Sequence, residues 1–255
     1  MRQKRSLGQV FLKDKKYIAK ILDSLDISGK NVLEIGPGQG EISAAISEKA
    51  KFLWCVEIDC RFYNYLENKF RQKSNVKIIN NDILKFPFSQ IAKKTVVFGN
   101  VPYHISSRLI KYLIENRKFI DKIYLTFQKE FAQKLLAQPS SKQYNFISCY
   151  TQYYVKIKKL FDIPAVSFQP VPKIDSSFIR IDFYRNGPHK AKNEEFLFKI
   201  IHKAFSNRRK KVINSLSVPV DILSKFKINR DLRAQDLSLE QYILLANELY
   251  PTYSF

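Results

Sequence analysis

The feature that most constrains the fold is an alternation between short apolar runs and helical segments in the first 137 residues. The apolar runs, which we interpret as buried strands, lie at 31–35, 52–56, 76–79, 95–98 and 122–127. Segments with apolar residues at helical spacing lie between or beside them, at 15–25, 42–49, 61–70, 106–116 and 129–137. Strands that alternate with helices form βαβ units, and strands that are apolar on both faces belong to parallel sheets. The pattern therefore predicts an α/β fold.

The pattern changes in the C-terminal half. Residues 153–163 and 176–184 alternate more between apolar and polar side chains, which is typical of antiparallel strands at a sheet edge. An Asn-Gly-Pro sequence within 184–190 then breaks the pattern. Three segments of helical periodicity follow, at 193–205, 207–216 and 238–249. We therefore expect two domains, an α/β domain over 1–186 with a basic N-terminal arm and a small all-helical domain over 187–255.

The charge of the chain favours a polyanionic partner. Lys and Arg number 44 against 23 Asp and Glu, which gives a formal net charge of +21. A protein this basic is attracted to nucleic acid. The excess is mostly Lys, in a chain rich in Ile, Asn, Phe and Tyr, and this profile is also typical of an A/T-rich genome. The charge supports a nucleic-acid partner without identifying one.

The compartment follows from the cysteines and the apolar runs. Cys55, Cys60 and Cys149 form no C-x-x-C pair, and their odd number argues against a disulfide framework. No run reaches the ~18 apolar residues of a membrane span. We expect a protein of the reducing cytoplasm with no membrane association. His189 and His202 lack Cys or acidic partners at ligand spacing, so we predict no metal site.

Polar features follow three successive strands at their carboxyl ends. The first strand runs into the glycine loop 36–40, which lets a ligand approach the main chain, although such a loop alone could equally be a tight turn. Glu57 ends the next strand, at the position where doubly wound folds hold ribose hydroxyls, and Asp82 ends the third. Because ligands of open α/β sheets bind at this edge, the pattern indicates a nucleoside site. Glu57 suits the ribose diol and Asp82 an adenine amine.

The fourth strand ends on the same edge, in the sequence GNVPYH. The Asn100 side-chain carbonyl and a main-chain carbonyl at Val101 or Pro102 could together accept both hydrogens of an exocyclic amine. This would free the lone pair of a nitrogen that is otherwise conjugated into a purine ring. Pro102 removes an N–H donor and stiffens the turn, and Tyr103 offers a flat face to an extruded base. A methyl donor held in line would then methylate the amine without a metal or a nucleophilic side chain.

These motifs resemble those of the KsgA family of rRNA adenine N6,N6-dimethyltransferases, over nearly the whole chain. The matching segments are LGQVFL (7–12), EIGPGQG (34–40), VEID (56–59), NDIL (81–84), GNVPYHIS (99–106), FQKEFAQKLLAQPSSKQY (127–144), FQPVPKIDSSFIRI (168–181), AFSNRRKKVINSL (204–216) and RAQDLSLEQY (233–242). The N-x-P-Y motif alone indicates methylation of a base amine in general, whereas the C-terminal segments are more specific to this family. The resemblance implies a Rossmann-like class I S-adenosylmethionine-dependent methyltransferase sheet over 1–186, with a small helical RNA-binding domain over 187–255.

The resemblance also implies a reaction and a set of residues. Two adjacent adenosines in the 3′-terminal hairpin of small-subunit (16S) rRNA would each receive two methyl groups on N6, during ribosome biogenesis. Contacts with S-adenosyl-L-methionine are implied for Val10, Leu12, Gly36, Gly38, Glu57, Asp82, Ile83 and Asn100, and catalytic contacts for Asn100, Val101, Pro102, Tyr103 and Phe168. Phe168 would be a second aromatic plate, opposite Tyr103 across the adenine.

The chain departs from the family pattern at two of these positions. The family usually has Asn where this chain has Val10, whose side chain cannot form a hydrogen bond. We expect either weaker cofactor binding or a main-chain group in place of that side chain. The family often has Asn where this chain has His104. We expect His104 to cap the turn or be solvated, since the chemistry needs no general base there.

Basic residues in two places are candidates for RNA contact. The run 207–211 contains Arg208, Arg209, Lys210 and Lys211, which would lie on a helix whose apolar face packs inward, although a solvated face is the ordinary interpretation of such a run. Arg5 in the N-terminal arm would lie near the same edge as the cofactor. Such contacts position RNA without specifying its sequence. The expected partner is the small ribosomal subunit, and the expected state is a monomer.

Two other functions remain compatible with the sequence. The protein could act mainly as a ribosome-assembly binding factor with weak catalysis, which Val10 favours and the intact Asn100 and Tyr103 oppose. It could also be a large-subunit rRNA methyltransferase of the macrolide-resistance type, which shares the motifs. The SSKQY and AFSNRRKKVINSL segments favour the small subunit. DNA adenine methylation fits less well, because such enzymes usually carry D/N-P-P-Y/F at this position.

Overall fold

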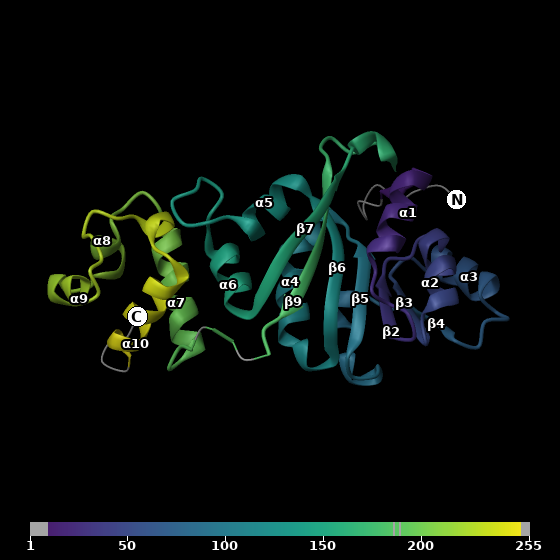
Figure 1. Cartoon of the computed structure of the whole chain (residues 1–255), viewed down its shortest axis with the longest axis horizontal. Coiled ribbons are helices and arrows are strands. Elements are labelled where there is room, and N and C mark those ends of the chain that lie inside the picture. Colours follow the sequence, from purple (N-terminus) through teal and green to yellow (C-terminus); the bar gives the residue numbers. More distant parts are fainter. Residues whose placement is uncertain (1–9, 186, 189, 251–255) are drawn as a thin grey trace. The chain divides into compact units, whose positions relative to one another are not determined.

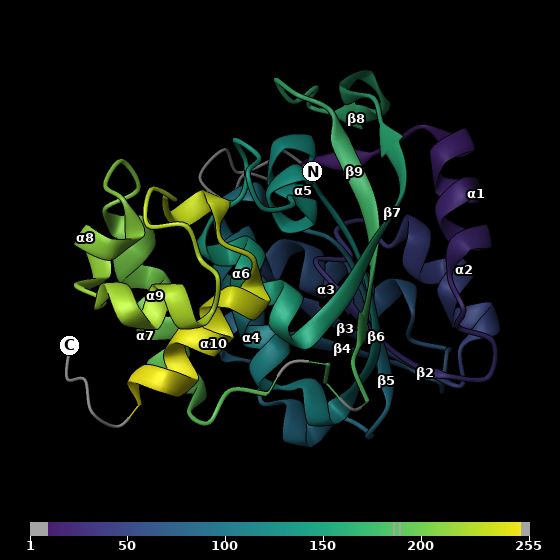
Figure 2. The same cartoon turned by 60° about the vertical axis from the view of Figure 1, so that its left-hand side comes forward.

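The computed structural model describes residues 10–185, 187–188 and 190–250. Within that part, the chain forms two compact units. The first comprises residues 10–132 together with Ile157–Phe183, and the second comprises Gln133–Lys156 together with residues 184–250. Figures 1 and 2 label the helices and strands of both units, which are described separately below.

The first unit is organised around a seven-stranded sheet in the order β4-β3-β2-β5-β6-β9-β7 (Figure 1). The strands are β2 (Asn31–Ile35), β3 (Phe52–Glu57), β4 (Val76–Asn80), β5 (Thr95–Asn100), β6 (Ile120–Gln128), β7 (Val155–Ile163) and β9 (Ser176–Phe183). Strands β2 to β6 pair in parallel, as the buried apolar runs predict. Strand β9 runs antiparallel to β6, with Leu125 opposite Ile179, so the predicted antiparallel edge is confirmed there.

Helices connect the parallel strands, as expected of βαβ units. The connecting helices are α2 (Glu41–Lys49), α3 (Cys60–Lys69) and α4 (Ser106–Glu115), whereas α1 (Lys15–Ser24) precedes β2 and α5 (Lys129–Leu136) follows β6. Asp14 caps α1 by accepting a hydrogen bond from the Lys16 N–H, and Asp59 caps α3 in the same way through Arg61. Short 3₁₀ helices lie at η2 (Ile83–Lys85), η3 (Phe88–Gln90), η4 (Tyr103–Ile105), η5 (Arg117–Phe119) and η6 (Ala165–Ser167).

The core of this unit joins the central strands to the first three helices. Its members include Val32, Leu53 and Val96 from strands with Ile21, Ile46 and Leu66 from helices, and each of these six is at most 1% exposed. Because the strands are parallel, the residues that follow β2, β3, β4 and β5 all emerge at one edge of the sheet. A separate two-stranded pair, β1 (Phe11–Leu12) with β8 (Phe168–Gln169), joins the start of the described chain to the connection between β7 and β9 (Figure 2).

The second unit is helical. It contains α6 (Phe146–Tyr154), α7 (Glu194–Ser206), α8 (Val212–Leu216), α9 (Val220–Lys225), η7 (Ala234–Asp236) and α10 (Leu239–Leu249). Helices α7 and α10 confirm the periodicity of 193–205 and 238–249. Helices α6 and α9 were not predicted, and residues 153–154, which we had expected in a strand, end α6.

The observed division of the chain differs from the expected one at 186/187, because residues 133–156 belong to the second unit. Tyr144, Cys149 and Tyr153 are at most 5% exposed and belong to the same core cluster as residues of α7 and α10. Sequence periodicity could not reveal this, because a segment that precedes β7 in the chain completes the core of helices that follow β9.

The expected helix over 207–216 is wrong in its first half. Helix α7 ends at Ser206, and residues 207–211 form turns before α8 begins at Val212. Lys211 forms an isolated antiparallel bridge with Arg233, and the Val212 N–H donates to the Leu232 carbonyl at 2.8 Å. These contacts hold Lys211 in an extended conformation that a continuous helix would not allow.

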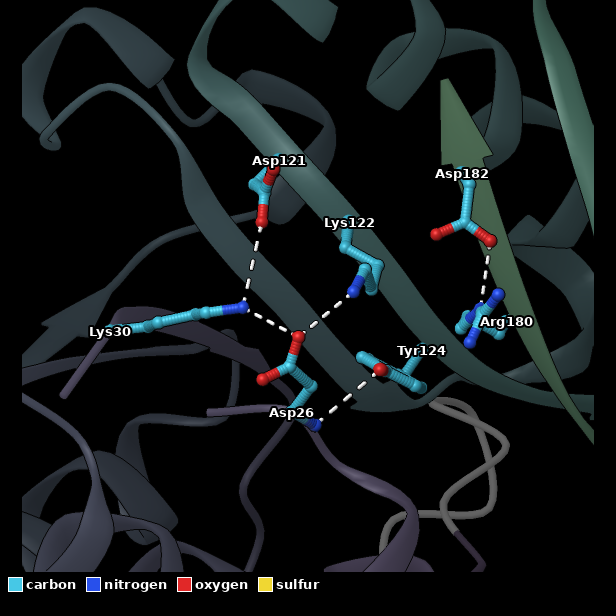
Figure 3. A network of polar contacts seen from close by, with 7 residues as sticks. All are labelled: Asp26, Lys30, Asp121, Lys122, Tyr124, Arg180 and Asp182. Carbon is cyan, nitrogen blue, oxygen red and sulfur yellow. Dashed lines mark hydrogen bonds and ion pairs between the residues drawn. The ribbon is translucent and has the colours of Figure 1, made fainter. Parts of the chain in front are cut away.

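A network of charges stabilises the side of the first unit where β2 and β6 begin (Figure 3). The Asp26 carboxylate pairs with Lys30 at 2.6 Å and with Lys122 at 3.0 Å, and its main-chain N–H donates to the Tyr124 hydroxyl. Hydrogen bonds from Lys30 and Lys122 lower the pKa of Asp26 to about 2. A carboxyl whose pKa is lower in the folded state contributes stability above its unfolded pKa and loses that contribution as pH falls.

We expect Asp26→Asn to lower the free energy of unfolding by less than about 1 kcal/mol at pH 7, because the side chain is 56% exposed and solvent screens the pairs. The difference from wild type should shrink as pH falls from about 4 toward 2, through the interval in which the native carboxylate is protonated. Urea unfolding at pH 7 and pH 3 measures both values. A difference that stays constant between these pH values would contradict the ion-pair explanation.

Candidate active site

A cavity of about 220 Å³ lies at the carboxyl edge of the parallel strands. Its walls come from the ends of β2, β3, β4 and β5 and from residues 10–13. The sequence-predicted residues that line it are Val10, Leu12, Gly36, Gly38, Glu57, Asp82, Ile83, Asn100 and Pro102. Four segments that are distant in the chain thus meet at one cavity, as the strand-end pattern predicts.

The glycine loop after β2 is tightly packed against the N-terminal segment. Gly38 has a φ of +57°, and a Cβ atom on it would lie 2.5 Å from Cε1 of Phe11. Lys69 of α3 donates from Nζ to the main-chain oxygens of Gln39 at 2.8 Å and Gly40 at 3.0 Å. The loop therefore needs glycine at position 38 for both its backbone conformation and its space.

Glu57, at the end of β3, is held against the glycine loop. Its carboxylate accepts hydrogen bonds from the Gly38 N–H at 3.1 Å and the Asp59 N–H at 2.9 Å. The residue is 3% exposed, and this burial raises the pKa of Glu57 above its ordinary value. Each carboxylate oxygen can accept a further hydrogen bond, so the group is oriented for a hydroxyl-bearing ligand in the cavity.

Glu34 is a cavity-lining carboxyl that the sequence analysis did not single out. It lies within β2, is 3% exposed, and accepts a hydrogen bond from Cys55 Sγ at 3.8 Å. Burial raises the pKa of Glu34 to about 7. The sequence feature that could have identified Glu34 is its charge inside an otherwise apolar strand, because burying an unpaired carboxylate is costly.

Asp82 and Ile83 follow β4. The Asp82 carboxylate accepts from the Leu84 N–H at 2.9 Å and so caps η2, while Ile83 is 5% exposed and adds apolar surface. Both line the cavity. This hydrogen bond fixes the direction of the Asp82 carboxylate, because the donor is a main-chain N–H of the same turn.

Asn100, the last residue of β5, has one end of its amide fixed and the other open. Its Nδ2 donates to the main-chain carbonyl of Val10 at 3.0 Å. Its Oδ1 is buried and has no hydrogen-bond partner among the described residues. A buried carbonyl oxygen without a donor is costly, so this atom marks a position where a ligand donor would be stabilised. Val10 thus contacts the site through its main chain, although its side chain cannot form a hydrogen bond.

The residues that follow Asn100 divide between the cavity and its surroundings. Pro102 lines the cavity, whereas Val101 is fully buried and does not. Tyr103 is half-buried, and its hydroxyl shares a hydrogen bond with Ser176 Oγ at 2.9 Å. Burial raises the pKa of Tyr103, so the phenol is neutral at physiological pH. The ring is therefore anchored by its hydroxyl end, and it lies three residues after Asn100 in the chain.

The structure differs from the sequence-based expectation at Phe168. Its ring is 2% exposed and lies in the same core cluster as Leu12, its partner in the β1–β8 pair. Phe168 is not among the residues that line the cavity. In this conformation the ring presents no open face to a base, because the pairing of the N-terminal segment covers it.

The basic run 207–211 also differs from the expectation. Arg208 donates from Nη2 to the Lys142 carbonyl at 2.7 Å and from Nε to Gln235 Oε1 at 3.1 Å, and Lys211 pairs with Asp231 at 2.6 Å. These two side chains serve the packing of the second unit. Arg209 and Lys210 are exposed, whereas Arg5 lies outside the described residues. The sequence alone could not show which of residues 208–211 have partners within the second unit, because the turn determines the direction of each side chain.

Comparison with known proteins identifies the family. A family model described as "Ribosomal RNA adenine dimethylase" matches residues 1–250. The chain belongs to this family. This dimethylase accordingly has S-adenosyl-L-methionine as its cofactor, and the fold is the Rossmann-like α/β fold of class I methyltransferases.

Curated relatives cover the dimethylase over nearly its whole length. The ribosomal RNA small subunit methyltransferase A of Wigglesworthia glossinidia brevipalpis is 38% identical over 252 residues, which cover 96% of this chain and 97% of the relative. The protein of the same name from Mesomycoplasma hyopneumoniae strain 232 is 37% identical, with 96% and 95% covered.

Solved structures resemble the dimethylase in fold. A dimethyladenosine transferase from Plasmodium falciparum has a TM-score of 0.80 at 25% identity, covering 94% of this chain and 97% of that one. The 23S rRNA methyltransferase ErmE has a TM-score of 0.74 at 23% identity, with 94% and 99% covered, which shows a shared fold alone. Of the helices described for this dimethylase, none has the length and apolar composition needed to cross a membrane.

Proposed function

We propose that this dimethylase methylates the N6 amines of two adjacent adenosines in the 3′-terminal hairpin of 16S rRNA, on the small ribosomal subunit, during ribosome biogenesis. The single observation that carries the proposal is the buried, unpartnered Oδ1 of Asn100 in a cavity walled by the glycine loop and Glu57. The names of the curated relatives support the small subunit as the target.

The donor set of the cavity fits S-adenosyl-L-methionine. We assign the ribose hydroxyls to Glu57, the adenine to Asp82 and Ile83, and the main-chain approach of the cofactor to Gly36 and Gly38. Leu12 and the main chain of Val10 close the cavity from the N-terminal side, and Asn100 contributes to both ligands. When bound, the cofactor supplies an electrophilic methyl group.

The residues of the chain prepare the target amine for that methyl group. Asn100 Oδ1 accepts one hydrogen of the adenine amine, and a main-chain carbonyl at Val101 or Pro102 accepts the other. These two acceptors favour a tetrahedral nitrogen whose lone pair is released from the ring. The Nδ2 hydrogen bond to the Val10 carbonyl keeps Oδ1 directed at the amine, so little reorganisation is needed. No strong general base is required, because the methylated ammonium loses its proton readily.

Tyr103 supplies the stacking face for the extruded adenine in this proposal. Its ring is held at the hydroxyl end by Ser176, so it is ordered before the base arrives. Phe168 does not serve as a second plate in the conformation described here, and we assign it to the packing of the β1–β8 pair.

The proposal is tested by transferring labelled methyl groups from S-adenosyl-L-methionine to purified, unmethylated small subunits, with large subunits as the control. Nucleoside analysis should detect N6,N6-dimethyladenosine in the small-subunit sample only. Transfer to large subunits instead would favour the macrolide-resistance type of enzyme. Tight binding to small subunits without any transfer would favour an assembly factor and would reject the proposed reaction.

The exposed pair Arg209 and Lys210 should behave differently from the hydrogen-bonded Arg208 when each is replaced. We expect Arg209→Ala with Lys210→Ala to reduce the slope of log K against log salt by about 1.5, because two phosphate contacts are lost, with little change in melting temperature. Arg208→Ala should instead lower the free energy of unfolding by about 1–3 kcal/mol, because two charge-assisted hydrogen bonds are lost.

Thermal unfolding and salt titrations of subunit binding, run on both variants, separate these effects. An unchanged salt slope in the double variant would exclude Arg209 and Lys210 as phosphate contacts.

We further propose that the dimethylase is a cytoplasmic monomer. Analytical ultracentrifugation without RNA would test the monomeric state.

A further inference from the structure

One charged side chain of the cavity wall, Arg108, has no part in the assignments above. It lies in the first turn of α4, lines the cavity together with Pro102, His104 and Ile105, and is exposed. Its position places a guanidinium on the same chain segment that is assigned to receive the target adenine.

Arg108 has no structural partner that would explain its presence. Among the described residues it forms neither an ion pair nor a hydrogen bond through its side chain. Lys13, another cation of the cavity wall, is by contrast paired with Glu41 at 2.5 Å. A positive charge in the first turn of a helix also opposes the helix dipole. The side chain is therefore available to a ligand and adds nothing to the stability of the helix.

The carboxylates of the cavity do not neutralise Arg108 either. Glu57 is held by two main-chain N–H groups, Asp82 by the Leu84 N–H, and Glu41 by Lys13. None of them lies within ion-pair distance of the Arg108 guanidinium. The guanidinium near the start of α4 is thus paired with no carboxylate of the described residues, so it is available to an anion.

The position of Arg108 favours an RNA phosphate as that anion. An adenine held between Asn100 and Tyr103 keeps its ribose and phosphates outside the cavity, at the mouth formed by η4 and the start of α4. Arg108 lines this part of the cavity, so the phosphates of the target nucleotide are the anions that approach its guanidinium. The cofactor carboxylate is the other anion of the reaction, and cofactor binding by the Arg108 variants distinguishes it from the phosphate.

We propose that Arg108 binds the RNA phosphodiester beside the target adenosine and thereby positions that adenosine in the cavity. The proposal rests on the proposed function, since it takes an extruded adenosine as the ligand. Arginine suits this role because its planar guanidinium can form two parallel hydrogen bonds with one phosphate.

Three variants test the proposal: Arg108→Ala, Arg108→Lys, and Lys51→Ala as the matched control. Lys51 is exposed and precedes β3, so its removal deletes one positive charge at the opposite edge of the same sheet. We expect Arg108→Ala to raise the KM for unmethylated small subunits about tenfold, as loss of a charge-assisted contact does. Its salt slope for subunit binding should fall by about 0.7–0.9.

The conservative variant and the cofactor distinguish a phosphate contact from a structural role. Arg108→Lys keeps the charge, so its salt slope should equal that of wild type. Its KM should lie between those of wild type and Arg108→Ala, because lysine cannot form the two parallel hydrogen bonds. The dissociation constant for S-adenosyl-L-methionine, measured by calorimetry without RNA, should be the same in all variants and in wild type. Melting temperatures should also agree, because Arg108 has no partner to lose.

Two results would overturn the proposal. A wild-type KM and salt slope in Arg108→Ala would show that no phosphate is bound there. A weaker affinity for S-adenosyl-L-methionine, with an unchanged salt slope, would assign the guanidinium to the cofactor carboxylate instead. Failure of the proposed function itself looks different, because the wild-type enzyme would then transfer no methyl group to small subunits.

Discussion

Asn100→Ala should reduce the rate of methyl transfer about 10²- to 10³-fold, the loss that follows when a preorganised group at the reacting atom is removed. The unpartnered Oδ1 is the side-chain acceptor assigned to the adenine amine, and alanine leaves that nitrogen conjugated with the ring. Single-turnover assays on unmethylated small subunits measure the rate directly. Subunit binding should remain close to that of wild type, since the phosphate contacts are unchanged.

The stability of the Asn100 variant should change little, because two effects oppose each other. Alanine loses the Nδ2 hydrogen bond to Val10, which is worth about 1 kcal/mol, and also removes a buried oxygen without a partner, which costs a similar amount. Asn116→Ala is the matched control, because this amide donates to the Tyr112 carbonyl at the other end of α4. A rate in Asn100→Ala above a tenth of wild type would reject the role of Oδ1.

Gly38→Ala should weaken the binding of S-adenosyl-L-methionine about 5- to 150-fold, the range that corresponds to an overpacking cost of about 1–3 kcal/mol. The new Cβ would lie 2.5 Å from the Phe11 ring, and the ring end of a side chain yields more easily than the backbone of the loop. Phe11 would therefore be displaced, and with it the N-terminal segment that closes the cavity. Calorimetry with the cofactor alone measures this effect.

Gly29→Ala separates backbone strain from the clash. Gly29 has a φ of +66°, similar to that of Gly38, but no atom within 4 Å of an added Cβ. It should lose about 1–2 kcal/mol of stability from the left-handed conformation and keep its affinity for the cofactor. The double variant Phe11→Ala with Gly38→Ala should recover part of that affinity. Equal cofactor affinities in the two single glycine variants would exclude the clash with Phe11.

The sequence predicts the parallel sheet and most of the cavity well, because both depend on local patterns. Buried parallel strands appear as apolar runs, and their carboxyl ends meet at one edge, so Gly36, Glu57, Asp82 and Asn100 could be placed together without a structure. Glu34 escaped notice because its charge lies inside such a run and only burial reveals it as part of the cavity.

Features that depend on contacts between distant segments could not be predicted. The family resemblance implies a stacking role for Phe168, yet the pairing of β1 with β8 buries it. Arg208 and Arg209 are adjacent and identical in type, and only the contacts of Arg208 with Lys142 and Gln235 distinguish them. Residues 133–156 join the helical unit for the same reason, through a core that no local periodicity records.

The hydrogen bond between Asn100 and Val10 has an evolutionary consequence. The acceptor is a main-chain carbonyl, which every amino acid carries, so no point mutation at position 10 can delete it. For this hydrogen bond, selection does not act on the side chain at position 10. It acts on the number of residues between position 10 and Lys13, which pairs with Glu41 beside the glycine loop. Insertions and deletions within 10–13, rather than substitutions at 10, are the changes that we expect lineages of this enzyme to purge.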